Sequence, residues 1–285
     1  MTSRPPALVL TPADTPPFTS VRGPNGDFLV VCDHASALVP RRLNALGLPA
    51  EVFKLHIAVD LGALWAAQRI AERLNCSLIA AGYSRLVVDC NRYPWYASSI
   101  PLESDRVSIP GNIGLSREAR AARLREIFVP YQVAVADALD TLMDRGARPV
   151  LLSIHSCTAV LNGQSRPWNI GVSYTEPGHL ARQLVEALRL NPNVYVGDNL
   201  PYAAELGDDY TTCEHASRRG LEYLQVEFRQ DLIATMNDAH VWADHYVNAV
   251  MAIPHPRSAP IWTPYWPAPH RNEDVMGLLE WPSAL

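Results

Sequence analysis

The sequence has few of the features that mark membrane, secreted or nucleic-acid-binding proteins. Its longest apolar runs have about the length of a strand and fall short of the roughly 20 residues that cross a bilayer, so we expect no membrane segment. The opening residues are interrupted by proline and lack a signal-peptide pattern, which makes the cytoplasm the default location. The net charge of −5 is spread along the chain without a Lys/Arg stripe, so no nucleic-acid partner is expected.

Common catalytic motifs are also absent. The sequence contains no GxSxG nucleophile elbow, HExxH helix, GxGxxG fingerprint or Walker A loop. Its five cysteines are widely spaced and form no CxxC pair, which argues against a disulfide framework and a cysteine-rich zinc site. Cys157 lies two residues after His155, but on an extended segment the two side chains point the same way without facing each other, which disfavours a cysteine nucleophile.

What the sequence does contain is an alternation of strand-like and helix-like segments. Its 285 residues, 48% of them hydrophobic, are enough for one large α/β domain. The alternation predicts a three-layer fold with a mixed, mainly parallel sheet and helices on both faces. We expect strands in FLVVC, SLIAA, RLVVD, PVLLSIH, WNIGVSY, NVYV and EYLQVEF, and helices over residues 54–74, 116–145 (interrupted at Pro130), 179–190 and 230–251.

Composition also predicts the domain boundaries. We expect a Pro-rich arm over residues 1–25, a single α/β domain over 26–252, and a Pro- and Trp-rich tail over 253–285 that packs on the domain. Long loops in compact domains are usually functional or disordered, and three are predicted here, at residues 92–115, 156–167 and 197–213.

The first candidate site follows the strand FLVVC. This strand ends in Asp33 and His34, followed by small residues, in the stretch VVCDHASALVP. Ligands gather at the carboxyl ends of strands in α/β proteins, so the pair is typical of an active-site rim. The alternative is a surface turn in which Asp33 caps the next segment. The tripeptide His-Ala-Ser occurs a second time at His215, with different flanking residues.

The second candidate is the pair His56 and Asp60 in HIAVDLG. On a helix these residues are four apart and share one face, which would allow both to bind a metal ion. A surface hydrogen bond is the alternative for His56. Asp60 stands among apolar residues, where a charge is costly unless it is paired or bound to a cation.

The third candidate is the stretch YSRLVVDCNR. On a strand, Arg85, Val87 and Asp89 share one face, and Asn91 and Arg92 lie just past the strand's end. Arg92 could bind a carboxylate in a bidentate manner, with Asp89 orienting it and Asn91 adding a neutral donor. The alternative is a buried Asp–Arg pair that ties a strand to a loop.

Two further strands deliver polar side chains at or near their ends. PVLLSIH ends in His155, a natural zinc ligand or, alternatively, a core histidine satisfied by a hydroxyl of Ser153 or Ser156. In LQVEFRQDL, Glu227 faces away from the most apolar side of its strand. It is a candidate general base or, alternatively, part of a Glu–Arg ladder on an edge strand.

These residues together resemble the N-formylglutamate amidohydrolase family, whose enzymes are similar to zinc carboxypeptidases and related deacylases in fold and mechanism. The matching stretches run in the same order from about residue 28 to 235: DHAS, HIAVDLGA, AGYSRLVVDCNR, LLSIHS, RPWNIGV, GDNLPY and VEFRQDL. The resemblance implies a zinc carboxypeptidase-like fold. It also implies that His34 and His155 bind zinc, that Glu227 is the general base, and that Arg92 with Asn91 binds the substrate carboxylate.

One position departs from the carboxypeptidase pattern. Those sites take two ligands from a His-x-x-Glu motif, and here the third residue after His34 is Ala37, which cannot bind metal. A carboxylate from elsewhere must replace the glutamate. We expect Asp60 in this role because of its apolar neighbours, with Asp33 as the second choice and His56 as a supporting partner.

The leading hypothesis is a hydrolase with one Zn²⁺ per chain, acting on small-molecule N-acyl amino acids. Its simplest reaction converts N-formyl-L-glutamate and water to formate and L-glutamate, with Arg85 and Arg166 helping Arg92 to neutralise the substrate carboxylates. One alternative is a zinc deacylase or peptidase acting on another N-acyl amino acid or a cell-wall fragment. A second is a metal-free carboxylate-binding module, which the Ala37 departure keeps open.

Overall fold

The computed structural model describes residues 8–175, 178–202 and 209–254. The first seven residues of the predicted arm, and the predicted tail from residue 255 onward, lie outside the described residues. Within this part of the chain, no helix is both long and apolar enough to cross a membrane.

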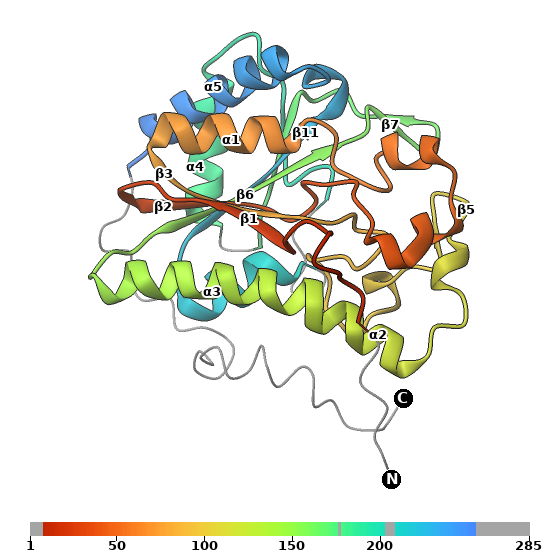
Figure 1. Ribbon diagram of the computed structural model, residues 1–285. Helices are drawn as coiled ribbons and strands as arrows, with labels where there is room; N and C mark the ends of the chain where they lie inside the picture. Colours follow the sequence, from red (N-terminus) through yellow and green to blue (C-terminus); the bar gives the residue numbers. More distant parts are fainter. Residues whose placement is uncertain (1–7, 176–177, 203–208, 255–285) are drawn as a thin grey trace.

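A seven-stranded sheet forms the centre of the molecule (Figure 1). Its spatial order is β1-β3-β2-β6-β11-β9-β10. Strands β3, β2, β6 and β11 are parallel, β1 pairs antiparallel with β3, and β9 pairs antiparallel with β11 and parallel with β10. The strands are β1 (Phe18–Val21), β2 (Asn25–Cys32), β3 (Cys76–Ala81), β6 (Val150–Cys157), β9 (Ile170–Ser173), β10 (Val196–Asp198) and β11 (Tyr223–Arg229), and two small hairpins are β4 (Glu103–Ser104) with β5 (Val107–Ser108) and β7 (Val160–Leu161) with β8 (Gln164–Ser165).

Helices cover both faces of this sheet. Helices α1, α4 and α5 lie on one face and α3 lies on the other, as Figure 1 shows. The helices are α1 (Ala63–Leu74), α2 (Arg117–Arg123), α3 (Val129–Asp144), α4 (His179–Arg189) and α5 (Met236–Ala252). The predicted fold class, a three-layer α/β fold around a mixed, mainly parallel sheet, is confirmed.

The central strands are apolar along their length because both of their faces are buried. Alternate residues of β2 serve the two layers: Val30 packs in the core beneath α1, α4 and α5, and Val31 packs in the core beneath α3. The same division holds on β11, where Leu224, Val226 and Phe228 are buried in the first core. Gln225 and Glu227 therefore project from the opposite face of β11.

The helix predicted over residues 54–74 is wrong in its first half. The chain forms a short 3₁₀ helix over Ala50–Lys54, and the α-helix begins only at Ala63. Gly62 precedes it with a φ of +79°, and a Cβ there would lie 2.1 Å from the carbonyl oxygen of Ile233. The left-handed backbone of Gly62, packed against Ile233, is incompatible with a continuous right-handed helix through this position.

The strand predicted for RLVVD is also wrong. Residues 82–92 form a series of turns, and the hydroxyl of Ser84 accepts the backbone N–H of Leu86 and donates to the carbonyl of Ala58. Leu86, Val87 and Val88 are nevertheless fully buried, in a core that lies beneath loops and short helices rather than in the sheet. The apolar run therefore predicted the burial of these residues correctly, but it did not predict whether they pair in a sheet.

Two predicted helices differ at their boundaries. The one over residues 116–145 is interrupted just before Pro130, as predicted, by a π-helical turn over Leu124–Phe128. The last helix begins at Met236 rather than at residue 230, because Thr235 is its N-cap and accepts the backbone N–H of Asp238.

The parallel arrangement decides where the polar strand ends meet. Because β2, β3, β6 and β11 run in the same direction, their carboxyl ends share one edge of the sheet. His34 follows β2, His155 lies near the end of β6, and Glu227 lies near the end of β11.

Candidate metal centre

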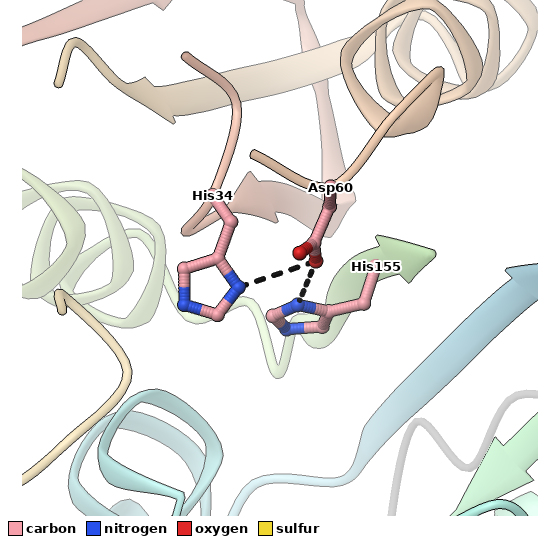
Figure 2. Close-up of side chains that lie close together, drawn as sticks. All are labelled: His34, Asp60 and His155. Carbon is pink, nitrogen blue, oxygen red and sulfur yellow. Dashed lines mark hydrogen bonds and ion pairs between the residues drawn. The ribbon is translucent and has the colours of Figure 1, made fainter. Parts of the chain in front are cut away.

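Three buried side chains converge at this edge: His34, Asp60 and His155 (Figure 2). The Nδ1 atom of His34 lies 3.2 Å from Oδ2 of Asp60, and the Nδ1 atom of His155 lies 2.9 Å from the same oxygen. Their ligand atoms all lie within 4.8 Å of one another. Two imidazole nitrogens and a carboxylate oxygen are therefore aimed at one small volume.

Asp60 reaches the centre from a loop and not from a helix. Its backbone N–H donates to the carbonyl oxygen of His34 at 3.0 Å, which ties this loop to the end of β2. The predicted pairing of His56 with Asp60 on one helical face is wrong, since this segment is not helical. His56 lines the outer part of the cavity, and its Nε2 lies 3.7 Å from Asp105.

The outer nitrogens of both histidines face further carboxylates. Nε2 of His34 lies 2.8 Å from Asp89, and Nε2 of His155 lies 3.3 Å from Asp33 and 3.0 Å from the hydroxyl of Ser153. Each Nε2 thus has polar partners of its own, while each Nδ1 faces Asp60. Carboxylates in this outer position orient histidine ligands in metal sites and make them more basic.

Asp33 lies outside the group of three, although it neighbours His34 in the chain. Its Oδ1 accepts hydrogen bonds of 2.7 Å from the hydroxyls of Tyr131 and Thr211. Of the two carboxylates considered from the sequence, Asp60 is the one that joins the two histidines, and Asp33 supports His155 from behind.

The electrostatics of the three residues fit a bound cation. Burial by itself lowers the pKa of His155, but its contacts with the carboxylates of Asp33 and Asp60 outweigh burial and hold that pKa well above the usual value. Burial and Arg85 likewise lower the pKa of His34, and Asp89 and Asp60 reverse the effect. Burial raises the pKa of Asp60, but the two histidines have the larger effect, and the net result is a pKa below the usual value. Positive charge is thus favoured between these groups, and two histidines with one carboxylate are a known donor set for a divalent metal.

A cavity of about 490 Å³ opens in front of this centre. A volume of this size is typical of sites for small molecules. Glu227 lines the cavity and pairs in register with His155 across β11 and β6. Burial, together with Asp60 and Asp209, raises the pKa of Glu227 to about 7 against the lowering effect of His155. The predicted general base therefore stands beside the candidate metal centre, on a central strand rather than an edge strand.

Two of the three arginines that line the cavity are paired with carboxylates. Arg85 lies 2.7 Å from Asp89 and 3.5 Å from Asp60. Arg92 lies 2.8 Å from Asp209. The structure therefore places Arg92 against the protein's own carboxylate, in the position where the sequence predicted a substrate carboxylate.

Asn91 joins the same arrangement. Its side-chain N–H₂ group donates to Oδ1 of Asp209 at 2.9 Å, and its oxygen accepts the backbone N–H of Thr211. Gln225 donates to the other oxygen of Asp209 at 3.0 Å. Asp209 therefore binds one guanidinium and two amide donors at the cavity wall.

Arg166 has different surroundings. Its guanidinium donates to the hydroxyl of Tyr202 at 2.8 Å and to Thr158 at 3.4 Å, and it lies over the Tyr202 ring at 4.9 Å from the centroid. No carboxylate in the described part of the chain forms an ion pair with it. Arg166 is buried yet lines the cavity, so its charge is available to an anion that enters.

Sequence reasoning missed Asp209, Tyr202 and Gln225. The signal for Asp209 was the length of the predicted loop over residues 197–213, and Tyr202 also ends the matching stretch GDNLPY. Gln225 could have been found from Glu227, since residues two apart on a strand share a face.

Comparisons with known proteins agree with this fold. The chain resembles the crystal structure of gene product Atu2144 from Agrobacterium tumefaciens, with a TM-score of 0.81 and 32% identity over 85% of this chain and 96% of that one. It shares a fold with the N-formylglutamate amidohydrolase of Ralstonia eutropha JMP134, with a TM-score of 0.53 and 18% identity over 83% and 96% of the two chains. A search of curated proteins found no match.

A family model extends this agreement to the sequence. The model of the N-formylglutamate amidohydrolase family matches residues 26–234, which include His34, Asp60, His155 and Glu227. This span is most of the chain and covers the region of the resemblance noted from the motifs. The chain belongs to the N-formylglutamate amidohydrolase family.

Proposed function

We propose that the protein is a zinc-dependent amidohydrolase that removes a small acyl group from the nitrogen of an amino acid. The reaction in the family's name, N-formyl-L-glutamate plus water giving formate and L-glutamate, is its simplest form. The observation that carries the proposal is the buried group of His34, Asp60 and His155 with Glu227 beside it. Family membership supports the reaction class.

Asp60 is placed to supply the metal ligand that Ala37 cannot provide. The metal-free binding module was considered because Ala37 cannot supply the ligand of a His-x-x-Glu motif. A carboxylate that lies 3.2 Å and 2.9 Å from the two histidine nitrogens replaces that ligand from another segment of the chain. This position of Asp60 supports a metal-dependent enzyme over a metal-free module.

The chain's own residues account for proton transfer and substrate position. A bound Zn²⁺ supplies Lewis-acid polarisation of the amide carbonyl and lowers the pKa of a water molecule. Glu227 would take a proton from the attacking water as the water oxygen bonds to the acyl carbon, and would give the proton to the nitrogen as the C–N bond breaks. Asp89 and Asp33 hold the two imidazoles in place, and Arg85 holds Asp60 and Asp89.

Arg166 is the residue we assign to the substrate carboxylate. Its described partners are neutral, whereas Arg92 is paired with Asp209. Binding the carboxylate there orients the amide relative to the metal centre, which supplies the entropic part of the rate enhancement.

Hydrolysis of N-formyl amino acids by the zinc-loaded protein tests the proposal. Formate and free amino acid should appear in equal amounts, and Arg166→Ala should raise KM by about ten- to a hundredfold, as expected for the loss of a charge-assisted hydrogen bond. Neutral formamides, which have no carboxylate to lose, are the matched control. Absence of formate with every N-formyl amino acid would contradict the proposed function.

A further inference from the structure

The positive charges in the cavity are not all available to a substrate. Arg85 is paired with Asp89 and Asp60, and Arg92 is paired with Asp209. Arg166 contacts only neutral groups among the described residues. A substrate with two carboxylates would therefore find one guanidinium that is free of a carboxylate partner.

The group around Asp209 has the composition of a carboxylate-binding site that is already filled. Its donors are the guanidinium of Arg92 and the side-chain amides of Asn91 and Gln225, at 2.8, 2.9 and 3.0 Å. A guanidinium with amide donors is a typical set for an anion. Here the anion is a side chain of the protein, and it lines the same cavity as Glu227 and Arg166.

The strand register separates Asp209 from Arg166. Glu227 pairs with His155, and Gln225, which holds Asp209, lies two residues before Glu227 on the same strand face. Thr158, which accepts from Arg166, lies three residues beyond His155. Gln225 lies about 6.6 Å before Glu227 along β11, whereas Thr158 follows the carboxyl end of β6.

We infer that the preferred substrate carries a single carboxylate, bound by Arg166, and that Asp209 occupies Arg92 in place of a second one. The inference rests on the proposed function and narrows its substrate class. The side chain of the substrate that faces Asp209 is neutral and able to donate a hydrogen bond, as a carboxamide does. A second carboxylate there would meet Asp209 with like charge and leave a buried charge unpaired, which disfavours binding strongly.

N-formyl-L-glutamine and N-formyl-L-glutamate are a matched pair for the test, because they have nearly the same shape and differ by one carboxylate. Their dissociation constants are measured by calorimetry with the zinc-loaded Glu227→Gln variant, in which turnover is slow, and their rates of formate release are measured with the native protein. We expect the glutamine compound to bind at least about tenfold more tightly and to be hydrolysed with the higher kcat/KM.

The Asp209→Asn variant tests whether Asp209 causes the preference for the glutamine compound. This nearly isosteric change removes the charge that neutralises Arg92, so the ratio between the two dissociation constants should fall about tenfold, towards equality or in favour of glutamate. Arg166→Ala is the control: it should weaken both compounds equally, since both carry the α-carboxylate. The comparison of the two compounds with the native protein needs no variant at position 209. It therefore remains a test of the substrate preference even if Asp209→Asn does not fold.

The outcomes separate the inference from the proposed function. Equal binding of the two compounds, or tighter binding of the glutamate compound, alongside hydrolysis of both would overturn the inference and leave the function standing. Preference for glutamine that persists in Asp209→Asn would overturn the role of Asp209. Hydrolysis of neither compound, nor of any other N-formyl amino acid, would overturn the proposed function itself.

Discussion

The tripeptide His-Ala-Ser occurs twice in the molecule, and its two histidines have opposite environments. His34 and His215 are both almost fully buried, at 3% and 1% exposure. His34 lies between Asp60 and Asp89, and these carboxylates outweigh burial and raise its pKa. Among the described residues, no carboxylate forms a hydrogen bond or ion pair with His215. Its Nε2 lies 2.8 Å from the side-chain oxygen of Gln132, and its Nδ1 has no hydrogen-bond partner among these residues.

The difference shows that burial alone does not make a histidine a metal ligand. Burial, with Arg219 adding to it, lowers the pKa of His215 to about 3, so this imidazole is a neutral part of the core. His34 follows a parallel strand at the edge where other polar strand ends meet, whereas His215 belongs to the π-helical turn Thr212–Ala216. The carboxylates that surround an imidazole distinguish the candidate ligand from the structural histidine.

The largest expected effect comes from exchanging the same residue in the two tripeptides. His34→Gln should reduce hydrolysis of N-formyl amino acids below detection, because it removes a proposed metal ligand. His215→Gln should retain most of the activity, since glutamine can keep a hydrogen bond to Gln132. Rates are measured with both variants after a thermal-unfolding check of folding. Equal loss of activity in two folded variants would contradict the different roles of His34 and His215.

The next effect isolates proton transfer from metal binding. Glu227→Gln should lower kcat by about 10²- to 10⁴-fold, the usual contribution of a general base, while metal content stays as in the native protein. Single-turnover rates and elemental analysis of the same sample provide the two readings. Near-native turnover in a metal-loaded Glu227→Gln variant would remove Glu227 from its proposed role.

A smaller effect distinguishes the two carboxylates near the histidines. Asp60→Asn should abolish tight zinc binding, whereas Asp33→Asn should weaken it only about 10- to 100-fold, as is typical for a group that orients a ligand. Competition with a chromophoric chelator measures both affinities. A greater loss in Asp33→Asn than in Asp60→Asn would reverse the assignment of the two residues.

An effect on stability, and not on activity, concerns His215. Its pKa is about 3 in the folded protein and 6.5 ordinarily, so between these values the unfolded chain binds a proton that the folded chain does not. Folding stability therefore falls as the pH drops, by about 1.4 kcal/mol per pH unit from about pH 6 to pH 4.

Denaturant unfolding of the native protein and of His215→Gln over this pH range measures that contribution. The variant should lack this part of the pH dependence, because glutamine does not titrate. Parallel stability curves for the two proteins would show that His215 is not buried as a neutral group.

The sequence predicted correctly the strands that are buried on both faces of the sheet. FLVVC, SLIAA, PVLLSIH and EYLQVEF are short apolar runs bounded by turn residues, and all four lie in the sheet. RLVVD has the same composition but packs beneath loops, since apolar residues signal burial and do not specify a pairing partner. The spacing around Asp60 matched a helix by coincidence, and the backbone contacts that make it a loop are long-range.

The candidate site was predictable where a strand delivers the side chain. His34, His155 and Glu227 follow from strand ends, and Asp60 follows from the cost of an unpaired charge among apolar residues. Asp209 and Tyr202 come from a loop that pairs with residues about 117 and 36 positions away, and nothing local in the sequence encodes those contacts. The partners of the three arginines, which decide what the cavity can bind, therefore required the structure.

Elemental analysis of metal content shows whether His34, Asp60 and His155 bind a metal ion. We expect about one zinc ion per chain in the native protein after equilibration with zinc and removal of excess. His155→Gln should lose that ion, whereas His215→Gln should keep it. Absence of bound metal in the native protein, or equal metal content in all three proteins, would contradict the assignment of His34, Asp60 and His155 as a metal centre.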